Sequence, residues 1–272
     1  MERTRSTQSR GRERRRIFPS TSLSKVKTRT VPEPHCVLTL LTEAATIPAT
    51  ALTAAVALYR GLGRPEPWTP APGGPSPDKA LVIYGASSAV GAFAIQLARE
   101  SNIHPIIAIA GAGLPLVETL IDTSKGDLAL DYRNGEEALS AAIAAAGYTP
   151  LHVLDAISEP RTLPLCARLL TKGGALAHVL PLPGDFSTEP GVSTVGIMLG
   201  KIHGYFGEES GARLFGEIWM HALSRGLQKG GWLKGHPWEV VEGGLDGLQG
   251  ALERLKSGQI SAKKLLLRLV DE

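Results

Sequence analysis

Apolar segments of strand length alternate with segments of helical composition over most of the chain. The strand-like segments are residues 80–84, 105–110, 127–132, 151–156 and 175–182. The first four are followed by helix-like segments at residues 89–100, 114–126, 135–147 and 160–174. Apolar strands that alternate with helices are typical of a parallel sheet covered on both faces, with right-handed crossovers. The pattern therefore predicts an α/β fold, a doubly wound parallel sheet of the Rossmann type.

A helix is also predicted ahead of this alternation. Residues 42–63 have Thr42 as a plausible N-cap and Gly61 near the end, which are helix start and stop signals. Pro48 lies inside this stretch and should kink or divide the helix. Residues 64–79 are so rich in Pro and Gly that we expect an exposed connector there.

The C-terminal part of the chain predicts one more helix and a closing strand. Residues 184–235 are irregular and rich in glycine, with a helix expected around residues 211–225. An amphipathic helix follows, because apolar residues recur at helical spacing. Its apolar stripe consists of Leu245, Leu248, Leu252 and Leu255. Residues 262–270 then supply a strand that closes the domain.

Charge is distributed unevenly along the chain. Residues 1–31 hold ten Lys/Arg and two acidic residues, a net charge of +8, whereas the 272-residue chain carries only +3, which leaves the remainder at −5. We expect residues 1–31 to be a disordered basic tail. The mildly acidic body argues against nucleic acid as a partner. No apolar run approaches the ~18 residues that span a bilayer, so no membrane partner is expected either. We expect a cytoplasmic protein, with mitochondrial targeting by the basic tail as the alternative.

Cysteine and histidine usage predicts no metal site. The two cysteines, Cys36 and Cys166, are far apart and neither belongs to a CxxC motif. The seven histidines form neither HxxxH nor HExxH. Structural and catalytic zinc sites need such clustered ligands. We therefore expect no metal and a reducing compartment.

A glycine-containing turn, GASSAVG, joins the first strand of the alternation to its helix. In the dinucleotide-binding fingerprint the first glycine permits the tight turn, the second lets the backbone approach the pyrophosphate, and the third lets helix and strand pack closely. Gly85 and Gly91 occupy the first and third positions, and Ser88 stands at the second. Serine reduces the clearance but adds a hydroxyl that can bond a phosphate oxygen. The turn predicts a nucleotide site, and a tight turn without a ligand is the alternative.

The residues at the end of the second strand indicate whether the cofactor is NAD or NADP. An acidic residue there would bond the ribose hydroxyls of NAD. This strand ends in residues 110–113, AGAG, without an acid, which favours NADP(H). Arg133, after the third strand, can reach an adenosine phosphate. Alternatively, residues 131–133 are an ordinary polar strand end.

The order of these segments resembles that of the zinc-independent medium-chain dehydrogenase/reductases, in particular fungal quinone-oxidoreductase-like enzymes and the trans-acting enoyl reductases of polyketide clusters. The resemblance runs from Thr42 to Asp271. Its segments are EAATIPATALTAAVALYRGLG, YGASSAVGAFAIQLA, DLALDYRNG, VLDAIS, KGGALAHVLPL and GGLDGLQGALERLKSGQISAKKLLLRLV. The resemblance implies strand order 3-2-1-4-5-6, NADPH as hydride donor, and reduction of an activated carbon–carbon double bond or a quinone. A small molecule or polyketide-type thioester of secondary metabolism is the implied substrate, and a monomer or homodimer the implied assembly.

The same resemblance implies the site residues. Ser87, Ser88, Ala89 and Val90 would hold the pyrophosphate, with Tyr132 beside the adenosine phosphate. Val179 and Leu180 would flank the nicotinamide. Ser261 and Ala262 match a terminal cofactor contact that the family usually writes with a glycine before the lysines. The substrate pocket would be bordered by Thr53, Ala54, Ala55, Val56, Ala57, Leu58 and Tyr59, and by Gly200, Lys201, Ile202, His203 and Gly204.

The chain departs from the family in its first part. Enzymes of this family begin with a GroES-like barrel domain that forms one wall of the substrate cleft, and we expect this chain to lack most of that domain. We expect residues 1–31 to be the tail, residues 32–78 to be a barrel remnant with the crossover helix and connector, and residues 79–272 to be the NADP-binding domain. Without the barrel, water exclusion and substrate positioning would suffer.

Two functions from different classes remain open from the sequence. The first is an NADPH-dependent reductase, whose chemistry needs few side chains because the cofactor carries the hydride. Tyr59 or Tyr205 would be the proton donor, although tyrosines at such positions commonly serve packing; no catalytic residue is assigned. The second is a truncated, non-catalytic nucleotide-binding protein. A short-chain dehydrogenase is disfavoured because no tyrosine is followed four residues later by lysine. A methyltransferase is disfavoured because the second strand end lacks an acid.

Overall fold

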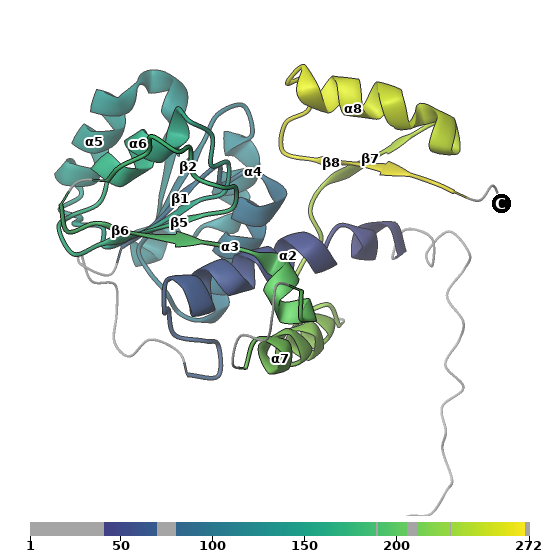
Figure 1. The fold of residues 1–272 in the computed structure, drawn as a ribbon, viewed down its shortest axis with the longest axis horizontal. Coiled ribbons are helices and arrows are strands. Elements are labelled where there is room, and N and C mark those ends of the chain that lie inside the picture. The colour runs from purple at the N-terminus through teal and green to yellow at the C-terminus, as the bar shows by residue number, and fades with distance from the viewer. Residues whose placement is uncertain (1–40, 70–79, 189, 206–210, 229, 270–272) are drawn as a thin grey trace, which may run out of the picture.

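The computed structural model describes residues 41–69, 80–188, 190–205, 211–228 and 230–269. A parallel sheet with helices on both faces forms the larger part, and a small strand–helix–strand unit lies at the C-terminal side (Figure 1). The strands of the main sheet are β1 (Leu81–Tyr84), β2 (Ile106–Ala110), β3 (Leu128–Asp131), β4 (His152–Asp155), β5 (Ala175–His178) and β6 (Ser193–Gly196). The helices that alternate with them are α3 (Ala89–Glu100), α4 (Leu114–Leu120), α5 (Glu136–Ala145) and α6 (Thr162–Arg168).

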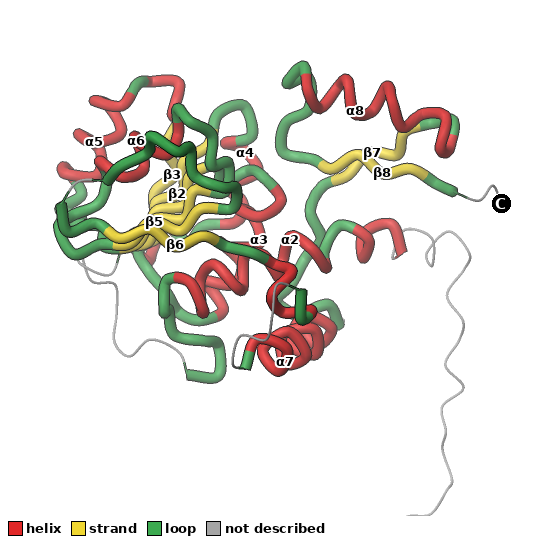
Figure 2. Tube along the Cα trace, in the orientation of Figure 1, coloured by secondary structure: helices red, strands yellow, loops and turns green. Residues whose placement is uncertain are grey.

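The main sheet has the order β3-β2-β1-β4-β5-β6, and every pairing in it is parallel. Figure 2 shows its strands side by side between helices. β1 lies at the centre, with Leu81 paired to Ile106 on one side and to His152 on the other. The order and the alternation confirm the predicted doubly wound Rossmann-type fold. β6, a short and mostly exposed edge strand, lies in the region where the sequence pattern was irregular.

The two faces of the sheet bury two separate cores, because alternate side chains of a strand point to opposite faces. Leu81 and Ile83 of β1 belong to the core shared with α3 and α4. Val82 and Tyr84 belong to the core shared with α5 and α6. All four residues of β1 and all five of β2 are buried, as expected for strands that are covered on both faces.

A further helical layer packs on the outside of α3. It consists of α2 (Pro48–Ala55), its continuation as a π-helix, η1 (Val56–Gly61), the short 3₁₀-helix η5 (Leu199–His203) and α7 (Ala212–Gly226). The Tyr59 ring stacks on the Trp219 ring of α7, with 4.6 Å between centroids and 11° between planes. This stack fixes α7 against the α2–η1 helix.

The predicted division of the first helix at Pro48 is confirmed. Residues 41–45 are helical, the helix is interrupted at Thr46 and Ile47, and α2 begins at Pro48, whose missing N–H is harmless in a first turn. The predicted stop is also confirmed, since η1 ends at Gly61. The predicted N-cap at Thr42 is wrong, because Leu41 is already helical.

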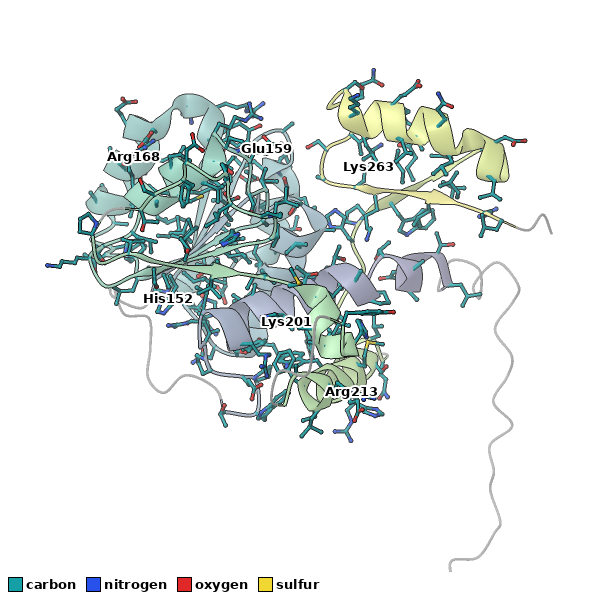
Figure 3. All side chains as sticks on the ribbon, in the orientation of Figure 1. His152, Glu159, Arg168, Lys201, Arg213 and Lys263 are labelled. Carbon is teal, nitrogen blue, oxygen red and sulfur yellow. The ribbon has the colours of Figure 1, made fainter. Side chains whose placement is uncertain are left out.

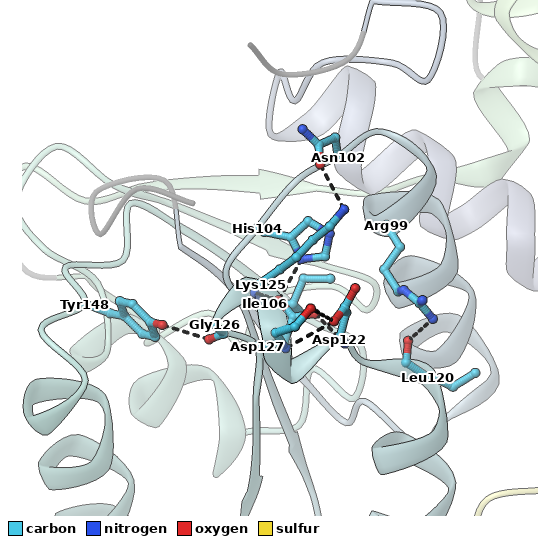
Figure 4. A network of polar contacts seen from close by, with 11 residues as sticks. Arg99, Asn102, His104, Ile106, Leu120, Asp122, Lys125, Gly126, Asp127 and Tyr148 are labelled. Atoms are coloured by element: carbon cyan, nitrogen blue, oxygen red, sulfur yellow. Dashed lines mark hydrogen bonds and ion pairs between the residues drawn. The ribbon is translucent and has the colours of Figure 1, made fainter. Parts of the chain in front are cut away.

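The amino-terminal edge of the sheet is held together by a buried carboxylate, Asp127 (Figure 4). Its Oδ1 accepts hydrogen bonds from the Nδ1 of His104 at 2.7 Å and from the backbone N of Ile106 at 2.8 Å. Its Oδ2 accepts a bond from the backbone N of Asp122 at 2.9 Å. Three donors from the segments that enter β2 and β3 therefore depend on one side chain.

The C-terminal unit consists of β7 (Trp238–Val241), the 3₁₀-turn η6 (Gly244–Gly247), α8 (Leu248–Lys256) and β8 (Lys264–Leu267). The predicted closing strand exists as β8, but it pairs in parallel with β7 and does not join the main sheet. The predicted amphipathic helix is also present. Its leucines are 41% to 67% exposed, and Ala251 is the residue that α8 buries. No described residue covers this leucine stripe fully.

Several predictions lie partly or wholly outside the described residues. These are the basic tail over residues 1–31, Cys36, most of the barrel remnant and the end of the connector. The division of the chain at residues 31 and 78 therefore stays a prediction. Within the described ranges, no helix is long and apolar enough to cross a membrane. In the same ranges, no three His, Cys, Asp or Glu side chains are grouped so that they could hold a metal ion.

Candidate functional site

A cavity of about 470 Å³ lies between the carboxyl edge of the main sheet and the C-terminal unit. This is where ligands bind in open α/β sheets, at the point where the strand order reverses beside β1. Predicted cofactor residues that line it are Gly85, Ser87, Ser88, Ala89, Tyr132, Ser261 and Ala262. Further lining residues that the sequence analysis did not select include Ile157, Glu159, Arg161, His236, Leu255 and Lys263. The structure thus brings the glycine turn, the end of β3 and the segment before β8 around one space.

Gly85 and Gly91 each meet a geometric requirement that another residue would violate. Gly85 has φ +71°, and a Cβ there would lie 2.5 Å from Ile157 Cγ1. A Cβ on Gly91 would lie 2.3 Å from the Gly85 carbonyl oxygen, so no side chain fits between α3 and the turn. Gly91 acts through this packing and does not line the cavity. These two glycines therefore perform the first and third roles of the dinucleotide fingerprint.

Ser88 stands at the second position of the dinucleotide fingerprint, where glycine is usual. It is the N-cap of α3, with φ −69° and ψ 162°, a conformation that needs no glycine. Its Oγ accepts a hydrogen bond from the backbone N of Gly91 at 3.1 Å. The hydroxyl hydrogen remains available to donate to a phosphate oxygen in the cavity. The first-turn amides of Ala89 and Val90 lack acceptors within the helix, which makes this end of α3 suited to an anion.

Two substitutions of Ser88 test its roles as the N-cap of α3 and as a hydroxyl donor to phosphate. Ser88→Ala removes the cap and the hydroxyl, and should lower the free energy of unfolding by about 1 kcal/mol. Ser88→Gly restores the usual second glycine and should lower it by only a few tenths of a kcal/mol. We expect Ser88→Ala to weaken dinucleotide binding more than Ser88→Gly, measured by calorimetric titration alongside urea denaturation. If both variants bind the dinucleotide as tightly as the unsubstituted protein does, then neither the Ser88 hydroxyl nor the space that its side chain occupies affects binding.

The end of β2 is shaped by close contacts with Tyr132 and with the segment before β8. A Cβ on Gly111 would lie 2.6 Å from the Tyr132 ring, and one on Gly113 would lie 2.4 Å from Ser87 Cβ and 2.8 Å from Ala262 Cβ. Ala262 itself has φ +56°, a left-handed conformation that glycine adopts more readily. The left-handed conformation fits the glycine that the resemblance implies at this position. The narrow spacing at Gly113 holds the C-terminal segment against the glycine turn.

Arg133 does not line the cavity. It forms an ion pair with Asp131, with Nη2 2.6 Å from Oδ2, and the pair shifts the pKa of Asp131 downward and that of Arg133 upward. Its backbone N also donates to Asp131 Oδ1 at 2.9 Å. This geometry agrees with the alternative that residues 131–133 are a polar strand end. Its predicted contact with the adenosine phosphate stays a prediction.

The loop after β4 is fixed by Asp155, which is fully buried. Oδ1 accepts from the backbone N of Ser158 at 2.8 Å, and Oδ2 accepts from the hydroxyl of Thr162 at 2.5 Å. The Ser158 hydroxyl accepts in turn from the backbone N of Val179 at 2.8 Å. These bonds place Ile157, Glu159 and Arg161 at the cavity and connect that loop with the end of β5. The sequence analysis matched residues 153–158, VLDAIS, to the family but selected no site residue here, because the role of this loop depends on where the strands end in space.

Val179 and Leu180 follow β5 at the same carboxyl edge. The Nδ1 of His178 donates to the Leu180 carbonyl oxygen at 2.7 Å, which holds this turn in place. Neither residue lines the cavity described above. Their predicted position beside the nicotinamide stays a prediction.

The two predicted substrate segments lie together, but only some of their side chains are accessible. Val56, Lys201 and Ile202 line a small cavity of about 100 Å³ together with Arg60. Ala54, Ala55, Ala57 and Leu58 have no exposed surface and belong to the core. As arranged in the described chain, these four side chains cannot contact a substrate, because α2 and η1 turn that face toward α3 and the sheet. Thr53, Gly200, His203 and Gly204 line neither cavity.

Tyr59 is a packing residue in this structure. It is 7% exposed, and its hydroxyl donates to the Leu97 carbonyl oxygen at 3.1 Å and is hydrogen-bonded to the Ser101 hydroxyl at 2.8 Å. Burial raises the pKa of this hydroxyl above its ordinary value. These contacts agree with the packing role that the sequence analysis weighed for Tyr59. Tyr205 is 66% exposed at the end of η5 and lines neither cavity.

Comparison with known proteins finds relatives that match most of this chain. No protein-family model matches it. The trans-enoyl reductase fsr4 of Gibberella fujikuroi is 40% identical over 210 residues, which cover 75% of this chain and 59% of the relative. The trans-enoyl reductase ffsC of Aspergillus flavipes is 31% identical over 233 residues, which cover 80% of this chain and 60% of the relative. The chain thus spans about three fifths of the length of the curated relatives it matches.

Solved structures agree on the fold. The CurK enoyl reductase has a TM-score of 0.56 at 21% identity, covering 80% of this chain and 59% of that one. The quinone oxidoreductase of Thermus thermophilus has a TM-score of 0.54 at 21% identity, covering 79% of this chain and 62% of that one. By sequence, the chain is therefore similar to the trans-enoyl reductases over about three fifths of their length, and its fold is similar to that of these solved oxidoreductases.

Proposed function

We propose that this chain is an NADPH-dependent oxidoreductase that reduces an activated carbon–carbon double bond. The observation that carries the proposal is the cavity at the carboxyl edge of β1, where the Gly85–Gly91 turn and the N-terminus of α3 face the Ser261–Lys263 segment. Anionic dinucleotides fit such a site because unpaired amides and a helix N-terminus favour phosphate. The trans-enoyl reductase homologues supply the reaction class.

The residues present fit the cofactor, and each has a defined task. NADPH, when bound, supplies the hydride. Ser87, Ser88 and the first-turn amides of α3 would bind the pyrophosphate. Tyr132 would contact the adenosine moiety across Gly111. The turn after β5, at Val179 and Leu180, would orient the nicotinamide, because the bonds from Ser158 and His178 hold that turn in place.

The absence of an acid at the end of β2 supports NADP(H) over NAD(H). A carboxylate there bonds the ribose hydroxyls and repels a 2′-phosphate. Residues 110–113 are Ala and Gly only, and Asp131 at the end of β3 is already paired with Arg133. The Thermus thermophilus quinone oxidoreductase of the same fold has been solved in complex with NADPH.

Introducing a carboxylate at this point should change the cofactor preference. Ala112 is exposed and lines the cavity, so Ala112→Asp is sterically tolerated. We expect it to weaken NADPH binding by at least about tenfold, since like charges repel the 2′-phosphate, and to leave NADH binding much less affected. Calorimetric titration with both cofactors measures the two affinities, and Ala112→Asn provides the uncharged control. An equal loss for NADPH and NADH would contradict the assigned position of the 2′-phosphate.

The substrate we propose is a small molecule or polyketide-type thioester of secondary metabolism, bound beside Val56, Lys201 and Ile202. The names of the homologues support the enoyl substrate. A quinone is the alternative substrate. We further propose a cytoplasmic protein that acts as a monomer or homodimer.

Turnover tests this proposal. The purified chain is mixed with NADPH and a short enoyl thioester, and NADPH consumption is compared with the saturated thioester detected by mass spectrometry. Stoichiometric consumption and product formation are expected, and a quinone in place of the thioester identifies the alternative substrate. Product formation that continues without NADPH would contradict the proposal.

A non-catalytic nucleotide-binding protein is the second candidate. The observation that favours it is the burial of Ala54, Ala55, Ala57 and Leu58, which removes four of the predicted substrate contacts. Tight NADPH binding without consumption of any thioester or quinone would favour this second function.

A further inference from the structure

The C-terminal unit contributes a charged wall to the cofactor cavity. Figure 3 shows Glu159 on the main-sheet side and Lys263 on the C-terminal side, and both residues line the cavity. Among the described residues that line it, the cationic side chains are Arg161 and Lys263. His236 also lines it, but burial and, secondarily, Lys264 lower its pKa to about 4, so it is neutral near pH 7.

The two cations differ in how their charge is balanced. Arg161 pairs one-to-one with Glu159, with Nε 3.2 Å from Oε2, and both residues belong to the same loop. Lys263 shares its carboxylate with a second cation. Glu239 of β7 accepts Lys263 Nζ on Oε2 at 2.5 Å and Arg254 Nη2 on Oε1 at 2.7 Å. Two cations thus share one carboxylate, so the Glu239 charge is not reserved for Lys263.

The position of Lys263 follows from its neighbour. Ala262 lies against the space at Gly113 that Ser87 also borders, so residue 263 is held next to the glycine turn. Lys264 points elsewhere, because its Nζ donates to the Thr46 carbonyl oxygen at 3.1 Å. Of these two adjacent lysines, it is Lys263 that lines the cavity.

We propose that Lys263 is the phosphate-binding cation of this cavity. Arg254 keeps the Glu239 carboxylate compensated, so the Lys263 ammonium can exchange its bond to Glu239 for a charge-assisted bond to a phosphate oxygen. The C-terminal unit and the main sheet then bind the same ligand, one through Lys263 and the other through the N-terminus of α3. This inference rests on the proposed function, since it assigns a further residue to the same site.

Two substitutions with opposite expected signs test the assignment. Lys263→Gln should weaken binding about tenfold, because a hydrogen bond to a charged group is lost. Glu239→Gln should tighten binding about threefold, because it removes the carboxylate that competes with the phosphate for Lys263. Lys256→Gln is the matched control, since this exposed lysine at the end of α8 loses the same charge but does not itself line the cavity. Urea denaturation checks that all variants are folded.

The ligands are NADPH, NADH and inorganic pyrophosphate, each titrated by calorimetry. We expect Lys263→Gln to weaken all three, which identifies the pyrophosphate as the contact, whereas a loss for NADPH alone identifies the 2′-phosphate. Affinities of Lys263→Gln that match those of Lys256→Gln for every ligand would overturn the inference. A protein that binds pyrophosphate through Lys263 but neither dinucleotide would contradict the proposed function and leave this inference standing. Binding of no phosphate ligand would overturn both.

Discussion

Gly91→Ala is expected to separate α3 from the glycine turn and to abolish dinucleotide binding. The added Cβ would lie 2.3 Å from the Gly85 carbonyl oxygen and 2.7 Å from Ala86 Cα, and both are backbone atoms that cannot rotate away. Relief requires α3 to shift from the strand, which disrupts the core at Phe93 and moves the phosphate-binding amides. We expect a loss of about 2–4 kcal/mol in the free energy of unfolding and at least about a hundredfold loss in NADPH affinity.

The chain offers a matched control for this substitution. Gly250 lies in α8, and a Cβ there would meet no atom within 4 Å. Gly250→Ala adds the same methyl group and should raise the free energy of unfolding by about 0.5–1 kcal/mol, because alanine is the better helix former. Urea denaturation and calorimetric titration measure both variants. Similar stability and affinity for the two would contradict the close approach of α3 to the turn.

Asp127→Ala is expected to be the most destabilising substitution far from the cofactor cavity. It leaves three donors without acceptors: His104 Nδ1 and the backbone N of Ile106, which are buried, and the partly buried backbone N of Asp122. Each unsatisfied buried donor costs about 1–3 kcal/mol, so we expect the free energy of unfolding to fall by about 3–5 kcal/mol. The cavity lies at the opposite, carboxyl edge of the sheet, so the NADPH affinity of the folded protein should be unchanged.

Asp122→Ala is the control for that experiment. This carboxylate accepts from the backbone N and the hydroxyl of Ser124 at 3.1 Å and 2.6 Å, on the protein surface. Its removal should lower the free energy of unfolding by only about 1 kcal/mol, as for other exposed caps. Urea denaturation of the two variants measures the difference. A loss at Asp127 no larger than at Asp122 would show that the buried network does not hold the sheet edge.

The sequence predicted the main sheet well because its strands are buried on both faces. Continuous apolar segments such as residues 106–110 are stable only where both of their faces are buried, as in the centre of a parallel sheet. The glycines between these segments mark the turns. β6 was not predicted because it is a short strand, and most of its residues are exposed at the sheet edge. β8 was recognised as a strand, but its pairing with β7 could not be read locally, because a strand pattern does not specify its neighbour.

The proposed cofactor site was predictable only in part, for a similar reason. The turn residues Gly85, Ser88 and Gly91 are specified by local geometry, and serine before a helix is a recognised N-cap signal. Arg161 and Lys263 reach the cavity because the loop after β4 and the segment before β8 converge in space. No local pattern encodes that convergence. Conversely, the buried face of α2 and η1 shows that a segment can resemble a substrate-binding segment and still turn most of its side chains into the core.

The central claim is that the Gly85–Gly91 turn and the Ser261–Lys263 segment together form a site for NADPH. Calorimetric titration of the purified chain with NADPH and NADH, under identical salt and pH, tests it most directly. The account predicts one NADPH bound per chain, with clearly weaker binding of NADH, and loss of the NADPH signal in Gly91→Ala. Absence of binding by both cofactors, in a protein shown to be folded by its urea denaturation, would contradict it.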